Sequence, residues 1–130
     1  MTYTYNYPMA MNTVDAIIVD KKTKSQILLI KRVNDPYKNC WALPGGFIEM
    51  NETLLESVIR ETKEETSLSD IEFYQFKTYG NPGRDPRGRN ITVVFFGYCQ
   101  DTEKAQAGDD AKELFWFSLD DLPDLAFDHK

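Results

Sequence analysis

The sequence contains few residues that bind soft metals or cross-link secreted proteins: two cysteines and one histidine among 130 residues. Cys40 and Cys99 have neither metal-ligand spacing nor a disulfide framework around them, which favours small buried thiols in a reduced, cytoplasmic setting. We expect the single histidine, His129, to be an exposed side chain rather than a catalytic base.

Long hydrophobic runs are also missing. Stretches such as ITVVFFGYC are far shorter than the roughly 20 apolar residues of a membrane-spanning helix, and no segment resembles a signal peptide. The 42% of hydrophobic and 13% of aromatic residues are typical of a chain that folds rather than a disordered one. We therefore predict a soluble globular protein without a membrane partner.

Basic residues are in the minority, with 15 Lys and Arg against 21 Asp and Glu and a net charge of −6. This balance argues against binding to nucleic acid backbones, which need basic patches. The excess of acidic residues is better suited to binding a cation. The length predicts a single domain over residues 1–130.

A helix is expected after Thr53, because Thr53 and Glu56 have the spacing of a capping box, with Asn51 as the alternative cap. Helical periodicity predicts which side of this helix faces the core. We expect the core-facing residues to be Leu55, Val58, Ile59 and Thr62.

Glu61, Glu64 and Glu65 lie three and four positions apart on this helix, so their carboxylates are neighbours that repel unless a cation binds. Hard oxygen ligands without histidine or cysteine favour Mg²⁺ or Mn²⁺ over Zn²⁺. Arg60 is placed to hold a carboxylate such as Glu52 in a fixed orientation. The alternative is a solvated helix face, which is the usual reason for a run of charges.

The longer spacing around this helix carries more information. From Gly46 to Leu68 the chain resembles the Nudix hydrolase signature, G-x5-E-x7-R-E-U-x-E-E-x-G-U, in which U is aliphatic. Every catalytic identity of the signature is present. Thr62 replaces an aliphatic residue, and Ser67 replaces the late glycine that turns a chain most easily.

The segments around the helix read as strands, which are expected at residues 13–20, 26–32, 40–43, 71–79, 90–100 and 113–118. The first two look like a hairpin. Asp35-Pro36 indicates an irregular loop after Arg32, and loops at strand ends often contact a ligand. Gly45-Gly46 is expected to form a turn that permits close approach of its backbone to metal or phosphate.

Three arginines, Arg84, Arg87 and Arg89, stand in one loop of an otherwise acidic chain. Arginine side chains match phosphate oxygens bidentately, so the loop is a candidate site for a pyrophosphate; a solvated hairpin tip is the alternative. The stretch also resembles the Arg-Asp-Pro-Arg-Gly loop of Nudix proteins that act on or sense ADP-ribose.

Strand and helix order predict an α+β domain with a mixed sheet, against which the helix packs. The resemblance implies the Nudix α/β/α sandwich and a Mg²⁺-dependent hydrolase that cleaves a nucleoside diphosphate linked to another group. For ADP-ribose the products are AMP and ribose 5-phosphate. It further implies a metal site of Glu61, Glu64 and Glu65, helped by a carbonyl of Gly45 or Gly46.

Several roles remain open between candidates. The general base is Glu64, Glu65 or Glu113, with Asp109 and Asp110 weaker matches. Phe76 and Tyr79 are candidates for stacking on adenine, and Arg32 for substrate contact.

Two other functions compete with ADP-ribose hydrolysis. One is a module that binds ADP-ribose without cleaving it, as in Nudix-type regulators; these carry a DNA-binding domain, for which we expect no room in this chain. The other is hydrolysis of damaged nucleoside triphosphates, for which the arginine loop is not needed.

The tyrosine-rich segment MTYTYNYPMAMN is expected to pack on the domain, build a homodimer or form a loose tail. Residues 125–130 resemble the start of the C-terminal helix of this family.

Overall fold

The computed structural model describes residues 4–33, 37–107, 111–126 and 129. The expected turn at Asp35-Pro36 and the base candidates Asp109 and Asp110 lie outside these residues.

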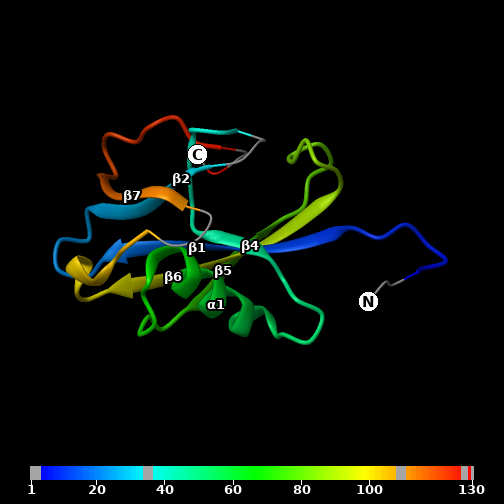
Figure 1. Cartoon of the computed structure of the whole chain (residues 1–130), viewed down its shortest axis with the longest axis horizontal. Helices are drawn as coiled ribbons and strands as arrows, with labels where there is room; N and C mark the ends of the chain where they lie inside the picture. The colour runs from blue at the N-terminus through cyan, green and yellow to red at the C-terminus, as the bar shows by residue number, and fades with distance from the viewer. Residues whose placement is uncertain (1–3, 34–36, 108–110, 127–128, 130) are drawn as a thin grey trace.

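The described residues form one mixed sheet beside one α-helix, α1 (Leu54–Thr66), as predicted. The strands are β1 (Met11–Asp20), β2 (Gln26–Arg32), β3 (Trp41–Ala42), β4 (Gly45–Phe47), β5 (Tyr74–Tyr79), β6 (Asn90–Cys99) and β7 (Ala111–Ser118). β1 pairs in parallel with β6 along its whole length and antiparallel with β4 and with β2, while β7 pairs with β2. Figure 1 shows α1 against one side of this sheet.

Both faces of the sheet carry apolar clusters. Alternate residues of β1, Val14, Ala16 and Ile18, point to the α1 side and pack with Val58 of the helix and with Leu68. A smaller cluster on Ile27, Leu29 and Leu43 includes Trp41, Phe117 and Leu125. The strand that is buried on both faces, β1, thereby fixes the position of the helix.

The expected turn at Gly45-Gly46 is wrong, because both glycines belong to strand β4. Gly45 pairs with Asp15 and Gly46 with Val14, and neither glycine has a positive φ. A Cβ atom on Gly45 would lie 2.1 Å from the carbonyl oxygen of Val14. Glycine is therefore needed here for the close approach of two strands rather than for a turn.

Three predicted strands are shorter than expected: β3 by one residue at each end, β6 by its last residue and β5 by its first three. β5 begins at Tyr74, not at residue 71, because Ile71 and Phe73 are buried against β6 before the ladder begins. A Cβ atom on Gly97 would lie 2.4 Å from Cγ2 of Ile71, so this packing depends on a glycine in β6.

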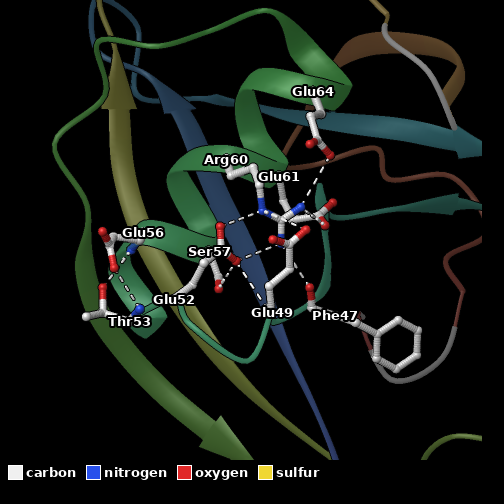
Figure 2. Close-up of polar contacts among 9 residues, drawn as sticks. All are labelled: Phe47, Glu49, Glu52, Thr53, Glu56, Ser57, Arg60, Glu61 and Glu64. Atoms are coloured by element: carbon white, nitrogen blue, oxygen red, sulfur yellow. Dashed lines mark hydrogen bonds and ion pairs between the residues drawn. The ribbon is translucent and has the colours of Figure 1, made fainter. Parts of the chain in front are cut away.

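The capping box that the sequence predicts is present at the start of α1 (Figure 2). The Glu56 N–H donates to Thr53 Oγ1 at 3.1 Å, and the Thr53 N–H donates to Glu56 Oε1 at 2.8 Å. At the other end Ser67 has a φ of 66°, so it adopts the left-handed conformation that the missing glycine would favour.

The predicted core face of the helix is partly wrong. Val58 and Thr62 are buried, but Leu55 is 45% exposed and Ile59 is 40% exposed. The buried helix residues are Ser57, Val58, Thr62, Glu65 and Thr66. The helix is rotated in this way because its Glu65 side faces β4, where the Gly45 N–H donates to Glu65 Oε1.

Leu125 and Ala126, after β7, lie along β3, and neither they nor His129, the described residues of the expected helix start, are helical. The Trp41 N–H donates to the Asp124 carbonyl, the Ala126 N–H donates to the Trp41 carbonyl, and Leu125 forms a parallel bridge with Trp41. His129 is buried rather than exposed, because its Nδ1 accepts a hydrogen bond from the Leu43 N–H at 3.1 Å.

Candidate active site

Two glutamates of α1 face the glycines of β4. Glu65 is buried, and its Oε1 accepts the Gly45 N–H at 2.7 Å. A Cβ atom on Gly46 would lie 2.6 Å from Cδ of Glu61, so only glycine leaves room for this carboxylate. The two glycines thus bring the strand against the acidic face of the helix.

Arg60 organises the carboxylates around it (Figure 2). Its Nε and Nη2 donate to Oε2 and Oε1 of Glu52 at 2.7 and 2.9 Å, the bidentate contact that the sequence predicts. Its Nη1 donates to Glu61 at 2.8 Å and to Glu64 at 3.4 Å, and Nη2 also donates to the Phe47 carbonyl at 3.1 Å. One guanidinium therefore joins both ends of α1 to β4.

Glu52 is held from several directions. Besides Arg60, the Ser57 hydroxyl donates to its Oε1 at 2.7 Å and the Glu49 N–H donates at 3.2 Å. These contacts, the Arg60 hydrogen bond first, lower the pKa of Glu52 to about 2. The same hydrogen bond raises the pKa of Arg60 above its ordinary value. Both groups are therefore charged at neutral pH.

The donor chemistry of this face fits a hard divalent cation, because three carboxylates lie on adjacent helical turns. The space that Gly46 leaves open keeps Glu61 beside the strand. Within the described ranges, however, no three acidic, histidine or cysteine side chains converge on one point. Arg60 donates to Glu61, the Gly45 N–H donates to Glu65, and the Glu64 side chain is 47% exposed, so a cation held by all three carboxylates would require Glu64 to turn inward.

Two cavities lie near Glu65 and Asp15, and a third, smaller one, called the passage below, shares lining residues with both. The acidic cavity, of about 470 Å³, is lined by residues that include Arg32, Phe47, Arg60, Glu61, Glu65 and Arg87. The aromatic cavity, of about 200 Å³, is lined by residues that include Asp15, Phe76, Tyr79, Arg84, Val94 and His129. The passage is lined by residues of both, among them Asp15, Arg32, Glu65, Arg84, Arg87 and His129.

The arginine loop is ordered by a buried aspartate. Arg87 donates through Nε and Nη2 to the fully buried carboxylate of Asp85 and lies 4.9 Å from the centre of the Phe47 ring. Burial raises the pKa of Asp85, but hydrogen bonds from Arg87 and Asn90 outweigh it and hold the pKa well below its usual range. Held in this way, Arg87 lines the acidic cavity.

The structure brings most of the predicted substrate residues to these cavities, but not all of them. Arg32, Arg84 and Arg87 line the passage, and burial, followed by the nearby charge of Arg87, lowers the pKa of Arg32. Arg89 is exposed, donates to the Gly80 carbonyl, and is not among the lining residues.

Glu113 also lies away from the cavities in the described part of the chain. Its side chain is 57% exposed on β7 and forms an ion pair with Lys31 at 3.6 Å. Its role as a base remains a prediction, as do the roles of the helix glutamates.

Sequence reasoning missed several residues of the passage, namely Thr13, Asp15, Asp85, Asn90 and His129. For Asp15 the signal was available: it is a carboxylate inside the apolar strand TVDAIIVD, and buried carboxylates require partners. The convergence of β1, β6 and His129 depends on pairing between strands that are far apart in the sequence.

A mixed sheet with a capped, carboxylate-bearing helix beside an arginine-lined cavity defines an α+β domain built around an acidic helix. The chain belongs to the NUDIX domain family, whose model matches residues 9–130. Members of this family generally use divalent metal ions.

Two relatives carry more specific names. The chain is 51% identical over 87% of its length to an ADP-ribose pyrophosphatase of Methanocaldococcus jannaschii, and 37% identical over 95% to the ADPR responsive transcriptional repressor NtrR of Acinetobacter baylyi. These matches span 65% and 52% of the two relatives, so the chain covers between half and two thirds of their lengths.

Among solved structures, the NUDIX domain of Shewanella oneidensis NrtR in complex with ADP ribose matches with a TM-score of 0.86 and 32% identity. This match covers 95% of the present chain and 83% of the other. In the described residues, no helix combines the length and apolar character that crossing a membrane would require.

Proposed function

We propose that this chain is a pyrophosphohydrolase that cleaves ADP-ribose to AMP and ribose 5-phosphate with Mg²⁺, or alternatively Mn²⁺. The observation that carries the proposal is the juxtaposition of Glu61 and Glu65 with Arg32 and Arg87 around one cavity. Carboxylates hold cations and arginines hold phosphates, so the cavity suits a metal-bound diphosphate. The 51% identical relative named ADP-ribose pyrophosphatase supports this substrate.

Glu61, Glu64 and Glu65 would hold the cation, with a carbonyl of Gly45 or Gly46. A divalent cation supplies charge neutralisation at the diphosphate and lowers the pKa of a water molecule that attacks phosphorus. Arg60 keeps Glu61 beside β4 through its 2.8 Å hydrogen bond, and Glu52 fixes the plane of the Arg60 guanidinium.

The proton from the attacking water requires a base on this chain. Glu64 is our choice, because its side chain is 47% exposed and its hydrogen bond with Arg60 is long, at 3.4 Å. Glu65 is less suited, since its Oε1 already accepts the Gly45 N–H. Glu113 is less suited because it lies on β7 and forms an ion pair with Lys31 of β2 rather than with a residue of α1.

The remaining groups would bind the nucleotide. Arg32, Arg84 and Arg87 line the passage and can donate to the diphosphate oxygens. Phe76 and Tyr79 line the aromatic cavity, where either ring can stack on adenine. The exposed Arg89 remains a weaker candidate for a phosphate contact.

A substrate panel tests the proposal. Purified chain is assayed with ADP-ribose, NADH, dinucleotide polyphosphates, nucleotide sugars and nucleoside triphosphates, each with Mg²⁺ and with Mn²⁺. We expect ADP-ribose to be turned over fastest, and Glu64→Gln to lose at least about a hundredfold in rate with its fold retained. Glu103→Gln, an exposed site outside the cavities, is the matched control. A near-normal rate for Glu64→Gln would refute its role as the base.

The second candidate is ADP-ribose sensing without cleavage, which the similarity to NtrR and to the ADP ribose complex of NrtR supports. Isothermal titration and product analysis on one sample separate the two functions. Tight binding in Mg²⁺ without release of AMP would favour sensing. Preferred cleavage of a damaged nucleoside triphosphate would instead favour the third function.

A homodimer remains part of the proposal. Tyr5, Tyr7 and Met9 are exposed in the segment before β1, and apolar side chains of this kind favour contact with a second copy. Light scattering on the chain with and without residues 1–9 tests this: a dimer that becomes a monomer supports it, and a monomer in both cases contradicts it.

A further inference from the structure

A buried acceptor on β1 faces the passage between the two cavities. Asp15 is 7% exposed, and its Oδ2 accepts the Thr92 hydroxyl from β6 at 2.6 Å. Its Oδ1 accepts no hydrogen bond from the described residues, and Nε2 of His129 lies 3.7 Å away, beyond hydrogen-bonding distance. Asp15 lines both the passage and the aromatic cavity.

The position of the ring proton of His129 follows from its hydrogen bond with Leu43. The Leu43 N–H donates to Nδ1, so Nδ1 carries the lone pair and the ring proton resides on Nε2. An N–H donor and a carboxylate acceptor therefore stand 3.7 Å apart in the passage.

This pair selects for one kind of ligand group. A single oxygen that sits about 2.8 Å from both atoms must accept from Nε2 and donate to Oδ1. A hydroxyl does both, whereas an amino group of a base only donates and a carbonyl only accepts. The pair formed by Asp15 and His129 is thus matched to a hydroxyl.

The position of the pair identifies the hydroxyl. The pair shares the passage with Glu65, Arg32 and Arg87, and it shares the aromatic cavity with Phe76 and Tyr79. In a nucleotide the ribose joins the phosphate to the base. A nucleotide with phosphates at the arginines and base at the aromatic rings therefore presents its ribose to Asp15.

We propose that Asp15 is a specificity-determining residue that accepts a hydrogen bond from the 2′- or 3′-hydroxyl of the adenosine ribose, while His129 donates to the same oxygen. The inference rests on the proposed function for its choice of ADP-ribose. It adds that the site discriminates ribonucleotides from deoxyribonucleotides.

The wild-type chain provides the first test, with no substitution needed. Isothermal titration in EDTA, where cleavage is stopped, compares ADP-ribose with its analogues that lack the 2′- or the 3′-hydroxyl of adenosine. We expect one analogue to bind at least about tenfold more weakly, the usual effect of losing a hydrogen bond to a charged group. ATP and its 2′- and 3′-deoxy forms are measured in parallel.

Variants then assign the effect to Asp15. In Asp15→Ala the ribonucleotide and its deoxy analogues should bind with the same affinity, and Asp15→Asn, which keeps the side-chain volume, should reduce the preference. The control is Val19→Ala, on the same strand face and equally buried but absent from the lining of the passage and of both cavities. Thermal unfolding of each variant verifies its fold.

The outcomes separate the two proposals. Deoxy analogues that bind the wild type as tightly as their parent nucleotide overturn the role of Asp15, whichever parent binds. Binding of ATP but not of ADP-ribose, with a ribose preference that Asp15→Ala abolishes, overturns the proposed substrate and supports the role of Asp15. A preference that survives in Asp15→Ala also overturns that role, and failure to bind any ribonucleotide overturns both.

Discussion

The Arg60 guanidinium donates hydrogen bonds to both carboxylate oxygens of Glu52, from Nε to Oε2 at 2.7 Å and from Nη2 to Oε1 at 2.9 Å. The two residues lie eight positions apart, one before α1 and one within it. Because the same guanidinium also holds Glu61, the orientation of a proposed cation ligand depends on Glu52, which does not line the acidic cavity.

Arg60→Lys should lower kcat/KM for ADP-ribose by about 10- to 100-fold, the usual effect of disturbing the partners of a metal ligand. An ammonium group is a point charge and cannot bond Glu52 bidentately while it also reaches Glu61 and the Phe47 carbonyl. The measurement is steady-state kinetics, with circular dichroism to verify the fold. Lys63→Ala, an exposed site on the same helix, should retain full activity, and full activity of Arg60→Lys would contradict the prediction.

Glu52 should contribute stability that depends on pH. Its pKa falls from 4.5 to about 2 on folding, so its contribution is complete above pH 4.5 and is lost as the pH falls toward 2. Urea unfolding of wild type and Glu52→Gln between pH 7 and 3 measures this contribution. The difference in unfolding free energy should be constant down to about pH 5 and then shrink. A difference that is independent of pH would argue against the Arg60 contact.

Gly46→Ala should displace Glu61, because the new Cβ would lie 2.6 Å from Glu61 Cδ and Oε2. The end of a side chain can move, so we expect at least about a tenfold loss of rate with an unfolding free energy changed by less than about 1 kcal/mol. Gly80→Ala is the control, since its Cβ would have an ordinary 3.5 Å contact with Ile91. Equal activity of the two variants would show that Glu61 needs no such placement.

Thr62→Val should stabilise the chain by about 1 kcal/mol, because the buried Thr62 hydroxyl has no hydrogen-bond partner in the described residues. Valine also restores the aliphatic residue of the family signature. Thr66→Val, one turn later, should destabilise by about 1 kcal/mol, since the Thr66 hydroxyl donates to the Thr62 carbonyl at 2.6 Å. Denaturant unfolding compares the two, and effects of the same sign would contradict the assignment.

Ser67→Gly should stabilise the end of α1 by about 1 kcal/mol, because the left-handed conformation costs a residue with a side chain about that much. The gain is partly offset by losing the Ser67 hydroxyl, which donates to the Gln106 carbonyl at 3.2 Å. Ser67→Ala loses this bond without relieving the backbone and should be destabilising. Thermal unfolding that ranks alanine above glycine would contradict this account.

Local spacing was sufficient for the features that lie within one helix. The capping box of Thr53 and Glu56 and the contact of Arg60 with Glu52 follow from fixed offsets along the chain, and all are present. The rotation of α1 about its axis could not be predicted from spacing, because Leu55 and Ile59 are apolar, as core residues usually are, and yet are exposed. The hydrogen bond from Gly45 to Glu65 turns the helix instead, and it joins residues 20 positions apart.

Patterns along the chain were enough to predict the acidic helix, the mixed sheet around it and the family. Which residues meet between the two cavities followed only from the folded arrangement of the strands. Asp15 and Thr92 are 77 positions apart and meet because β1 pairs with β6 in parallel, and His129 joins them through its hydrogen bond to Leu43. Patterns along the chain show which residues are neighbours on a helix or share a face of a strand. Contacts between distant residues depend instead on the order and register of the strands.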